Sequence, residues 1–138
     1  MNASDRPLFE PIPGLEDMAL NTLALNAFVP AQRFEHSKRF YKDIGFTMDW
    51  SSQELAHFQR GPTSFMLQNF YAKDLAENLV MHLLVQSVDA WWAHLVNAGI
   101  GEKYQVRLVP PQQQPWRMRD FVLTDPSGVL WRIAQKTR

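Results

Sequence analysis

The hydrophobic and polar positions of this chain follow one order of elements twice. The apolar run LALNAFV at residues 23–29 predicts a strand, and a helical pattern closed by Gly45 and three short strand-like runs follow it. The apolar run LVMHLLV at residues 79–85 begins the same order again, with a helical pattern closed by Gly99. Such self-similarity is typical of a duplicated supersecondary unit. It predicts a cleft between the two copies, lined by equivalent positions from each.

Both helical patterns place apolar or small residues at spacings of 3, 4 and 3, which predicts one buried face on each helix. These positions are Phe34, Ser37, Tyr41 and Ile44 in the first half, and Val88, Trp91, Leu95 and Ala98 in the second. Ser87 precedes the second pattern and belongs to the residue types that cap helix N-termini. We therefore expect helices over residues 34–44 and 88–98.

The remaining apolar runs are short and separated by turn signals, which predicts strands. We expect these strands at residues 46–50, 55–59, 64–70, 103–109, 119–124 and 129–135. The segment PPQQQPW at residues 110–116 is rich in proline and polar residues, so we expect it to be a rim loop outside the sheet. Each half then has the order β-α-β-β-β, which is an α+β fold.

This order of elements predicts the domain organisation. Prolines interrupt residues 1–21, which we expect to form an irregular N-terminal arm. Residues 22–138 are expected to form a single domain, with one module at residues 22–78 and the other at residues 79–138. The length of 138 residues and the 46% of hydrophobic residues are sufficient for one buried core.

The composition of the chain limits which partners the protein can bind and where in the cell we expect it. Fourteen basic residues balance fourteen acidic ones, so no overall field favours nucleic acid. No apolar run approaches the roughly 20 residues that a membrane-spanning helix needs, so we expect no membrane association. The chain has no cysteine, which excludes disulfides, thiolate metal ligands and a cysteine nucleophile. Together with an acidic, proline-rich start that does not resemble a signal peptide, this composition predicts a cytoplasmic protein.

Three segments of the chain resemble a known family. They are VPAQRFEHSKRFYKDIGF at residues 29–46, HLLVQSVDAWWAHLVNAGI at residues 82–100 and PWRMRDFVLTDPSGVLWRIAQ at residues 115–135. They are similar to the vicinal oxygen chelate superfamily, which includes glyoxalase I, extradiol dioxygenases, fosfomycin-inactivating proteins and, in the branch that this chain resembles most, bleomycin-resistance proteins. The resemblance implies two tandem β-α-β-β-β modules that form a curved, mostly antiparallel open barrel around a cleft, and commonly a homodimer. Whether the modules pair within one chain or between two chains stays open.

In metal-dependent members of this superfamily, the first and last strands of each module hold the ion. Because side chains alternate between the two faces of a strand, the corresponding cleft positions can be found from the pattern of core residues. They are Asn26, Gln68, His82 and Arg132. This set offers one imidazole, two weakly coordinating amides and a permanent cation, which is a poor ligand set for a divalent ion. We therefore expect neither a metal nor another cofactor, with His82 as the single plausible metal ligand.

The same alternation places Phe28 and Met66 toward the cleft and assigns Leu23 and Leu25 to the core. Trp116 lies on the proline-rich segment, where little core is available to it. Binding pockets are commonly lined by aromatic and apolar side chains. We therefore expect Trp50, Phe58, Met66 and Trp116 to form an apolar wall for a ligand, with Phe28 as a further ligand-binding residue in the cleft.

Two of these residues have alternative roles. His82 interrupts an apolar strand and could bind a ligand, act as a general acid or base, or be a half-buried histidine held by a neighbouring amide. Arg132 interrupts the last apolar strand and needs an anionic partner, because an unpaired guanidinium is costly to bury. That partner is either an internal carboxylate such as Asp120 or a ligand carboxylate or phosphate.

The leading functional hypothesis is a metal-independent small-molecule-binding protein that sequesters a neutral or anionic ligand in the cleft between the modules. The alternative is a metal-dependent lyase, isomerase or dioxygenase with its ion on His82. A third possibility is a structural or interaction module, whose cleft would be filled by its own side chains. The identity of the ligand lies in a few loop residues, and the fold hosts many functions.

Overall fold

The computed structural model describes residue 14 and residues 19–138, so most of the expected N-terminal arm lies outside the described residues. The first module consists of β1 (Phe28–Pro30), α1 (Phe34–Ile44), β2 (Thr47–Ser51), β3 (Leu55–Arg60) and β4 (Thr63–Gln68). A short helix, α2 (Lys73–Asn78), leads to the second module. That module consists of β5 (Val80–Leu84), α3 (Val88–Asn97), α4 (Ile100–Tyr104), β6 (Leu108–Gln114), β7 (Met118–Thr124) and β8 (Leu130–Lys136).

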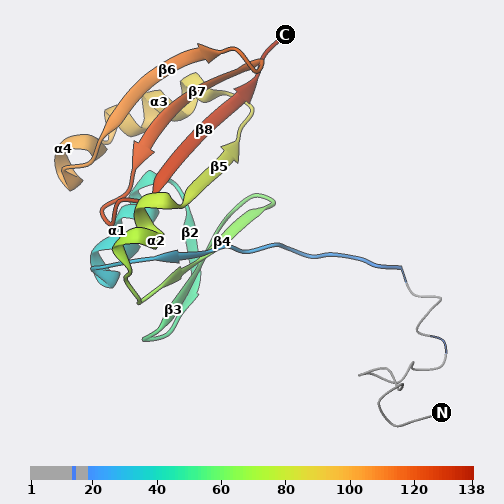
Figure 1. Cartoon of the computed structure of the whole chain (residues 1–138), viewed down its shortest axis with the longest axis vertical. Helices are drawn as coiled ribbons and strands as arrows, with labels where there is room; N and C mark the ends of the chain where they lie inside the picture. The colour runs from blue at the N-terminus through green and yellow to red at the C-terminus, as the bar shows by residue number, and fades with distance from the viewer. Residues whose placement is uncertain (1–13, 15–18) are drawn as a thin grey trace.

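Each module forms a four-stranded sheet with the same topology. The strand orders are β1-β4-β3-β2 and β5-β8-β7-β6. The first strand of each module runs parallel to the last strand, and the other pairings are antiparallel. The two sheets follow one another along the long axis of the molecule, with α1 and α3 on the same side of them (Figure 1). The predicted α+β fold of two tandem β-α-β-β-β modules is confirmed, and the sheets remain open rather than forming a closed barrel.

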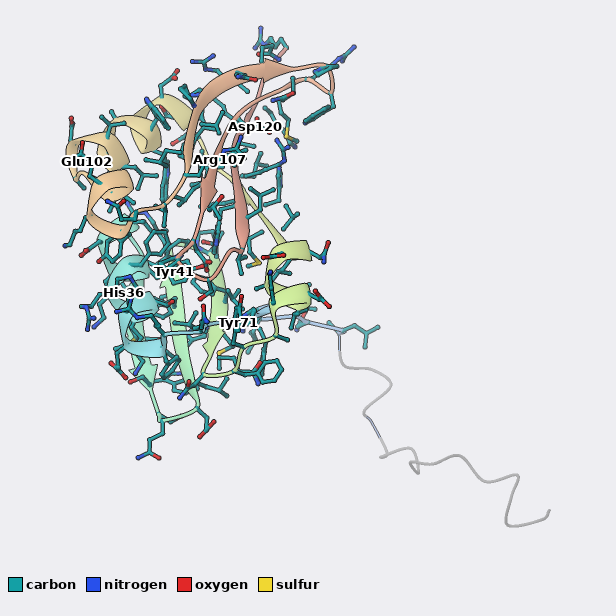
Figure 2. The ribbon with its side chains drawn as sticks, turned by 60° about the vertical axis from the view of Figure 1, so that its left-hand side comes forward. His36, Tyr41, Tyr71, Glu102, Arg107 and Asp120 are labelled. Atoms are coloured by element: carbon teal, nitrogen blue, oxygen red, sulfur yellow. The ribbon has the colours of Figure 1, made fainter. Side chains whose placement is uncertain are left out.

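One hydrophobic core joins the two modules. The hydroxyl of Tyr41 on α1 is fully buried and donates a hydrogen bond to Asp125, which precedes β8. The indole N–H of Trp131 on β8 donates back to the Tyr41 oxygen over 3.0 Å. Figure 2 shows Tyr41 between the two modules. The modules are therefore held together by a buried polar contact as well as by apolar packing.

The helices follow the sequence pattern closely. Helix α1 spans the predicted residues and ends at Gly45, whose φ of +125° favours glycine. The Ser87 hydroxyl accepts a hydrogen bond of 3.1 Å from the amide of Ala90, which confirms the predicted N-cap of α3. Ala98 is exposed just beyond that helix, so its predicted burial is wrong. None of the helices in the described part of the chain has the length and hydrophobicity of a membrane span.

The strand predicted at residues 23–29 is largely wrong. Regular pairing begins only at Phe28, and β1 pairs with β4 over three residues. Residues 19–27 have no regular secondary structure, and Leu23 and Leu25 are almost fully exposed rather than buried. The alternation of apolar residues identified an extended segment, but it could not show which surface, if any, the segment packs against.

The proline-rich segment forms a strand instead of the expected rim loop. Residues 110–114 belong to β6. The strand expected at residues 103–109 begins only at Leu108, after the end of α4 and a connection. Strand β6 is at the edge of its sheet, so only one side of it needs to pair. Pro110 and Pro111 lie where the register with β7 shifts, between Val109 and Gln112. A bulge at this point tolerates residues without an amide hydrogen.

Candidate functional site

The uncovered face of the second sheet carries a row of three side chains from three strands. His82 on β5 is in register with Arg132 on β8, and Arg132 is in register with Val122 on β7. The alternate positions of the same strands, including Leu83, are buried beneath α3. Because strand side chains alternate between faces, the row containing His82 and Arg132 projects away from the helix. The structure thus places these two predicted residues side by side.

Arg132 has an internal partner. Its Nη1 donates to Oδ2 of Asp120 over 3.1 Å, and Nε2 of Gln114 donates to Oδ1 of the same carboxylate over 2.9 Å. Asp120 is 3% exposed, whereas the Arg132 side chain is 36% exposed. Of the two partners predicted for Arg132, the structure therefore contains the internal carboxylate. Gln114 was missed at the sequence level, because the neighbouring prolines concealed the alternation of β6.

A groove of about 270 Å³ adjoins this pair of charges. Asp120, Arg132 and Arg107 line the groove, together with apolar residues that include Leu130. Figure 2 shows Arg107 and Asp120 on the second sheet. The Nε and Nη2 groups of Arg132 have no acceptor among the described residues, so they remain available as donors. The groove can therefore offer guanidinium hydrogen bonds to a ligand oxygen while Asp120 neutralises part of the positive charge.

His82 also borders a cavity at the junction of the modules. The cavity has a volume of about 270 Å³ and is lined by Ser64 of the first module and by His82 and Trp131 of the second. The Ser64 hydroxyl donates to Oδ1 of Asn26 over 2.6 Å. Asn26, which is predicted to be the equivalent of His82, thus contacts a residue that lines this cavity but does not line the cavity itself.

The other predicted residues are more widely distributed. Phe28 is 51% exposed and in register with the buried Met66, and Gln68 lies two positions further along the same face of β4. Trp116 is 56% exposed in the turn between β6 and β7. It lines neither of the two cavities near His82. The structure therefore groups Phe28, Met66 and Gln68 on the first sheet and leaves Trp116 apart. Phe58 is fully buried in the hydrophobic core, so its predicted place in the ligand-binding wall is wrong.

The first sheet contains an oriented histidine that the sequence did not reveal. Nδ1 of His57 lies 2.6 Å from Oδ1 of Asp49, and the imidazole stacks on Trp50 with an interplanar angle of 8°. His57 is also in register with Met66, so it belongs to the uncovered face. The register of the β2–β3 hairpin brings these residues together, whereas their spacing along the chain resembles no known motif.

The side chains at the four family positions do not form a suitable ligand set for a divalent metal ion. In residues 14 and 19–138, no group of three His, Cys, Asp or Glu side chains is arranged to hold a metal. The four family positions contain one imidazole, two amides and a guanidinium that is already paired with Asp120. A cation placed beside Arg132 would be repelled by its permanent charge. We therefore derive no chemical step that passes through a metal.

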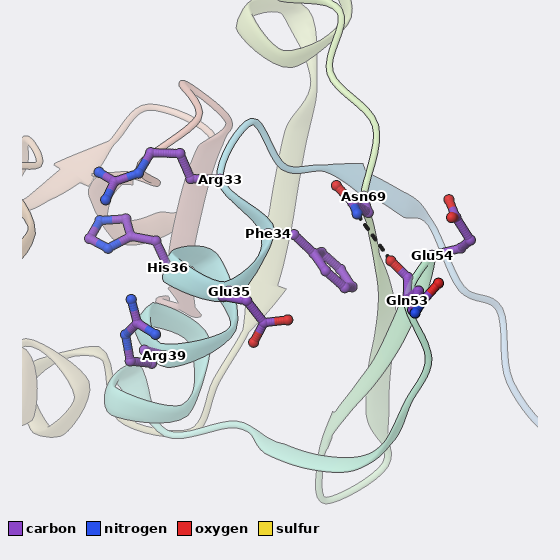
Figure 3. Close-up of a pocket in the computed structure, with 8 residues that line it drawn as sticks. All are labelled: Arg33, Phe34, Glu35, His36, Arg39, Gln53, Glu54 and Asn69. Atoms are coloured by element: carbon purple, nitrogen blue, oxygen red, sulfur yellow. Dashed lines mark hydrogen bonds between the residues drawn. The ribbon is translucent and has the colours of Figure 1, made fainter.

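A hollow beside α1 is larger than the two cavities near His82 and Arg132, but the charged side chains that line it do not converge. It has a volume of about 590 Å³. Figure 3 shows Arg33, His36 and Arg39 on one side of the helix and Glu35 on the other side, so the charged groups point apart. Burial and the nearby charges of Arg33 and Arg39 lower the pKa of His36, which favours its neutral form. This hollow is a weaker candidate than the face around His82.

Several solved structures share this fold. A bleomycin-binding protein complexed with bleomycin has 23% sequence identity and a TM-score of 0.73, with 83% of this chain and 99% of that chain covered. The bleomycin-binding protein of Streptomyces verticillus, complexed with copper(II)-bleomycin, has 18% identity and a TM-score of 0.69, with coverages of 87% and 99%. The antibiotic-binding protein TnmS3 from Streptomyces sp. CB03234 has 23% identity and a TM-score of 0.67, with coverages of 87% and 100%. At these identities the likeness shows the fold alone.

The family itself is shown by the sequence. No curated protein matches the chain significantly. The model of the Glyoxalase/Bleomycin resistance protein/Dioxygenase superfamily matches residues 20–133, which is most of the chain and includes both modules. The resemblance inferred from the helix and turn segments is therefore confirmed, and the chain belongs to the Glyoxalase/Bleomycin resistance protein/Dioxygenase superfamily.

Proposed function

We propose that this protein binds a small organic molecule on the uncovered face around His82 and Arg132 and sequesters it without a metal ion. The observation that carries this proposal is the register of β5 and β8, which places the two side chains next to each other between two cavities. A few convergent polar groups beside apolar walls are typical of ligand sites. Asn26, held by Ser64, supplies a further polar group at the same junction.

The ligand that best suits this face is neutral or anionic and carries oxygen acceptors. Two donor nitrogens of Arg132 have no acceptor within residues 14 and 19–138, and Arg107 lines the same groove. The one carboxylate in that groove, Asp120, already accepts from Arg132 and Gln114. A cationic ligand would need additional carboxylates, whereas guanidinium donors bind carbonyl, carboxylate and phosphate oxygens well.

The first sheet supplies the apolar part of the proposed site. Phe28 on β1 pairs with Met66 on β4. Met66 pairs with His57 on β3, which in turn pairs with Trp50 on β2. Gln68 adds an amide at the edge of this surface. Trp116 belongs to the proposed site only if the ligand, or a second copy of the chain, reaches the β6–β7 turn.

We also propose that the protein is a cytoplasmic homodimer. Leu20, Leu23 and Leu25 are almost fully exposed on the extended segment that precedes β1. This segment extends away from the two sheets (Figure 1). Exposed apolar surface of this kind marks contacts with a partner molecule. A second copy would cover these leucines. The cytoplasmic location rests on the cysteine-free, charge-balanced composition.

Calorimetric titration with a ligand panel tests the proposed function. The panel starts with bleomycin, because similar structures are described as bleomycin complexes, and adds neutral and anionic aromatic compounds. We expect micromolar or tighter binding of one compound to chelator-treated protein, and at least a tenfold loss of affinity in His82→Ala, which corresponds to about 1.4 kcal/mol. Arg39→Gln, on the exposed surface of α1, is the matched control and should bind normally. Equal affinity of His82→Ala and wild type would refute the assignment of the site.

The competing function is a metal-dependent lyase, isomerase or dioxygenase. It is favoured by one observation: the His82 imidazole has no hydrogen-bond partner among the described residues and occupies a position where the superfamily places a metal ligand. Elemental analysis of protein purified without chelator separates the two functions. Metal-independent binding predicts no stoichiometric divalent ion, whereas one ion per chain that is absent from His82→Ala would favour the enzyme.

A further inference from the structure

Three side chains meet at a second place on the module junction, around Gly45 at the end of α1. A methyl group on Gly45 would lie 3.8 Å from Nη1 of Arg60 and 3.8 Å from Cη2 of Trp91. It would lie 3.9 Å from Nε2 of His94. These side chains come from β3 and α3, and they border a cavity of about 270 Å³. Because Gly45 has no side chain, the space between them stays open.

Arg60 is exposed at the border of this cavity, and two contacts hold it in place. Its Nη1 donates to the carbonyl oxygen of Gly45 over 2.9 Å, and its guanidinium lies 5.4 Å from the centre of a Trp91 ring. Such a cation–π contact orients the guanidinium plane. Arg60 forms no ion pair with any acidic side chain of residues 14 and 19–138. The guanidinium therefore carries an uncompensated positive charge and donors that are not used by the protein.

His94 supplies a second nitrogen donor. It lies on α3, one turn after Ala90, whose small side chain leaves room in the cavity. The imidazole of His94 has no hydrogen-bond partner among the described residues. In the part of the chain that the structure describes, the residues that line the cavity are Ile44, Gly45, Arg60, Ala90, Trp91 and His94. It thus contains two nitrogen donors, one aromatic wall and no carboxylate.

We propose that this cavity binds the oxyanion of a small organic acid. Arg60 and His94 donate to the oxyanion, and Trp91 packs against the ring or chain that carries it. A neighbouring groove of about 650 Å³ shares Arg60 and Trp91 and continues past Leu84 and Val85, which gives the apolar part of the ligand a place to lie. This site does not rest on the function proposed for the face around His82.

Chemical-shift mapping of the full-length protein by NMR tests the proposal, with sodium benzoate and inorganic phosphate as separate probes. We expect benzoate at millimolar concentration to shift the backbone amide of Gly45 and the indole N–H of Trp91 in a saturable way. Inorganic phosphate should shift the same signals more weakly, because it has no ring to pack against Trp91. Saturation by phosphate alone would identify the oxyanion as a phosphate, whereas no saturable shift with either probe would overturn the proposal.

Two variants separate binding from structural effects. Arg60→Gln should weaken benzoate binding at least tenfold, but it also removes the hydrogen bond to Gly45 and could perturb the junction. His94→Gln removes no hydrogen bond of the described structure and should still weaken binding severalfold. Arg39→Gln is the control for loss of an exposed arginine and should bind benzoate like the wild type. Wild-type affinity in His94→Gln and Arg60→Gln would refute the site.

Discussion

Arg132 illustrates what can be inferred at the scale of single residues. A guanidinium within an apolar strand requires a partner, and Asp120 was one of the two partners that the sequence allowed. The structure adds that Asp120 is far more buried than Arg132 and that Gln114 completes its hydrogen bonding. Arg132 therefore stabilises a buried carboxylate and offers its remaining donors to a ligand.

Removing Arg132 should destabilise the fold as well as reduce ligand binding. We expect Arg132→Met to lower the free energy of unfolding by about 1–3 kcal/mol, because the buried Asp120 loses a charged donor. Urea unfolding at neutral pH measures the loss. The double variant Arg132→Met/Asp120→Asn should be less destabilised than the sum of the single variants. Additive losses would show that the pair is not coupled.

Tyr41 is the residue that links the modules most directly. Burial, and then the neighbouring charge of Asp125, raise the pKa of the Tyr41 phenol well above its ordinary value, so it stays a hydrogen-bond donor. Tyr41→Phe leaves Asp125 with one donor fewer and the Trp131 indole N–H without its acceptor. We expect a loss of about 1–3 kcal/mol in urea unfolding. An unchanged midpoint would contradict the importance of this contact.

At the scale of elements, the sequence predicted helices better than strands. A helix of eleven residues such as α1 repeats its apolar spacing often enough to define its face and its end at Gly45. Short strands have too few residues to define a clear alternation. The prolines of β6 predicted a loop, and this prediction failed because an edge strand with a bulge tolerates proline. The two short helices α2 and α4 have only six and five residues, too few for a period to be recognised.

The contact between α1 and α4 should make stability depend on pH. Partial burial raises the pKa of Asp43, but hydrogen bonds from Lys103 and Tyr104 outweigh this effect and hold the pKa below the ordinary aspartate value of 3.8. A carboxylate with a lowered folded-state pKa stabilises the protein above its unfolded pKa. That stability is lost as the pH falls through the folded-state value.

Comparison with Asp43→Asn isolates this contribution. At neutral pH the variant should be less stable by about 0.5–1 kcal/mol, since the pair is partly exposed. The difference should shrink as the pH falls from neutrality to below 3.8, because the wild type then loses the charge that the variant never had. Unfolding curves at a series of pH values measure it. Parallel pH dependences of the two proteins would contradict the assignment.

At the scale of the whole molecule, the doubled pattern correctly predicted two modules of equal topology. It could not predict the register between strands, and the candidate site depends on that register. His82 and Arg132 meet because β5 and β8 are parallel and aligned, and His57 meets Asp49 through a hairpin. The exposed leucines before β1 were missed for a related reason, since an apolar pattern does not distinguish a buried segment from an exposed one.

The exposed leucines provide a prediction about assembly. If a second copy covers Leu23 and Leu25, then Leu23→Ser/Leu25→Ser should shift the protein from dimer to monomer at micromolar concentration. Light scattering coupled to size-exclusion chromatography measures the mass. Val96→Ser, at an exposed apolar position of α3, serves as the control and should stay dimeric. A wild-type monomer would refute the dimer outright.

The central claim is that a small molecule binds, without a metal, on the face around His82 and Arg132. Chemical-shift mapping of chelator-treated protein with the tightest compound of the calorimetric panel tests it most directly. We expect saturable shifts at Asn26, Ser64, His82 and Arg132 in the absence of any divalent ion. Shifts confined to other parts of the molecule, or binding that appears only after a divalent ion is restored, would contradict it.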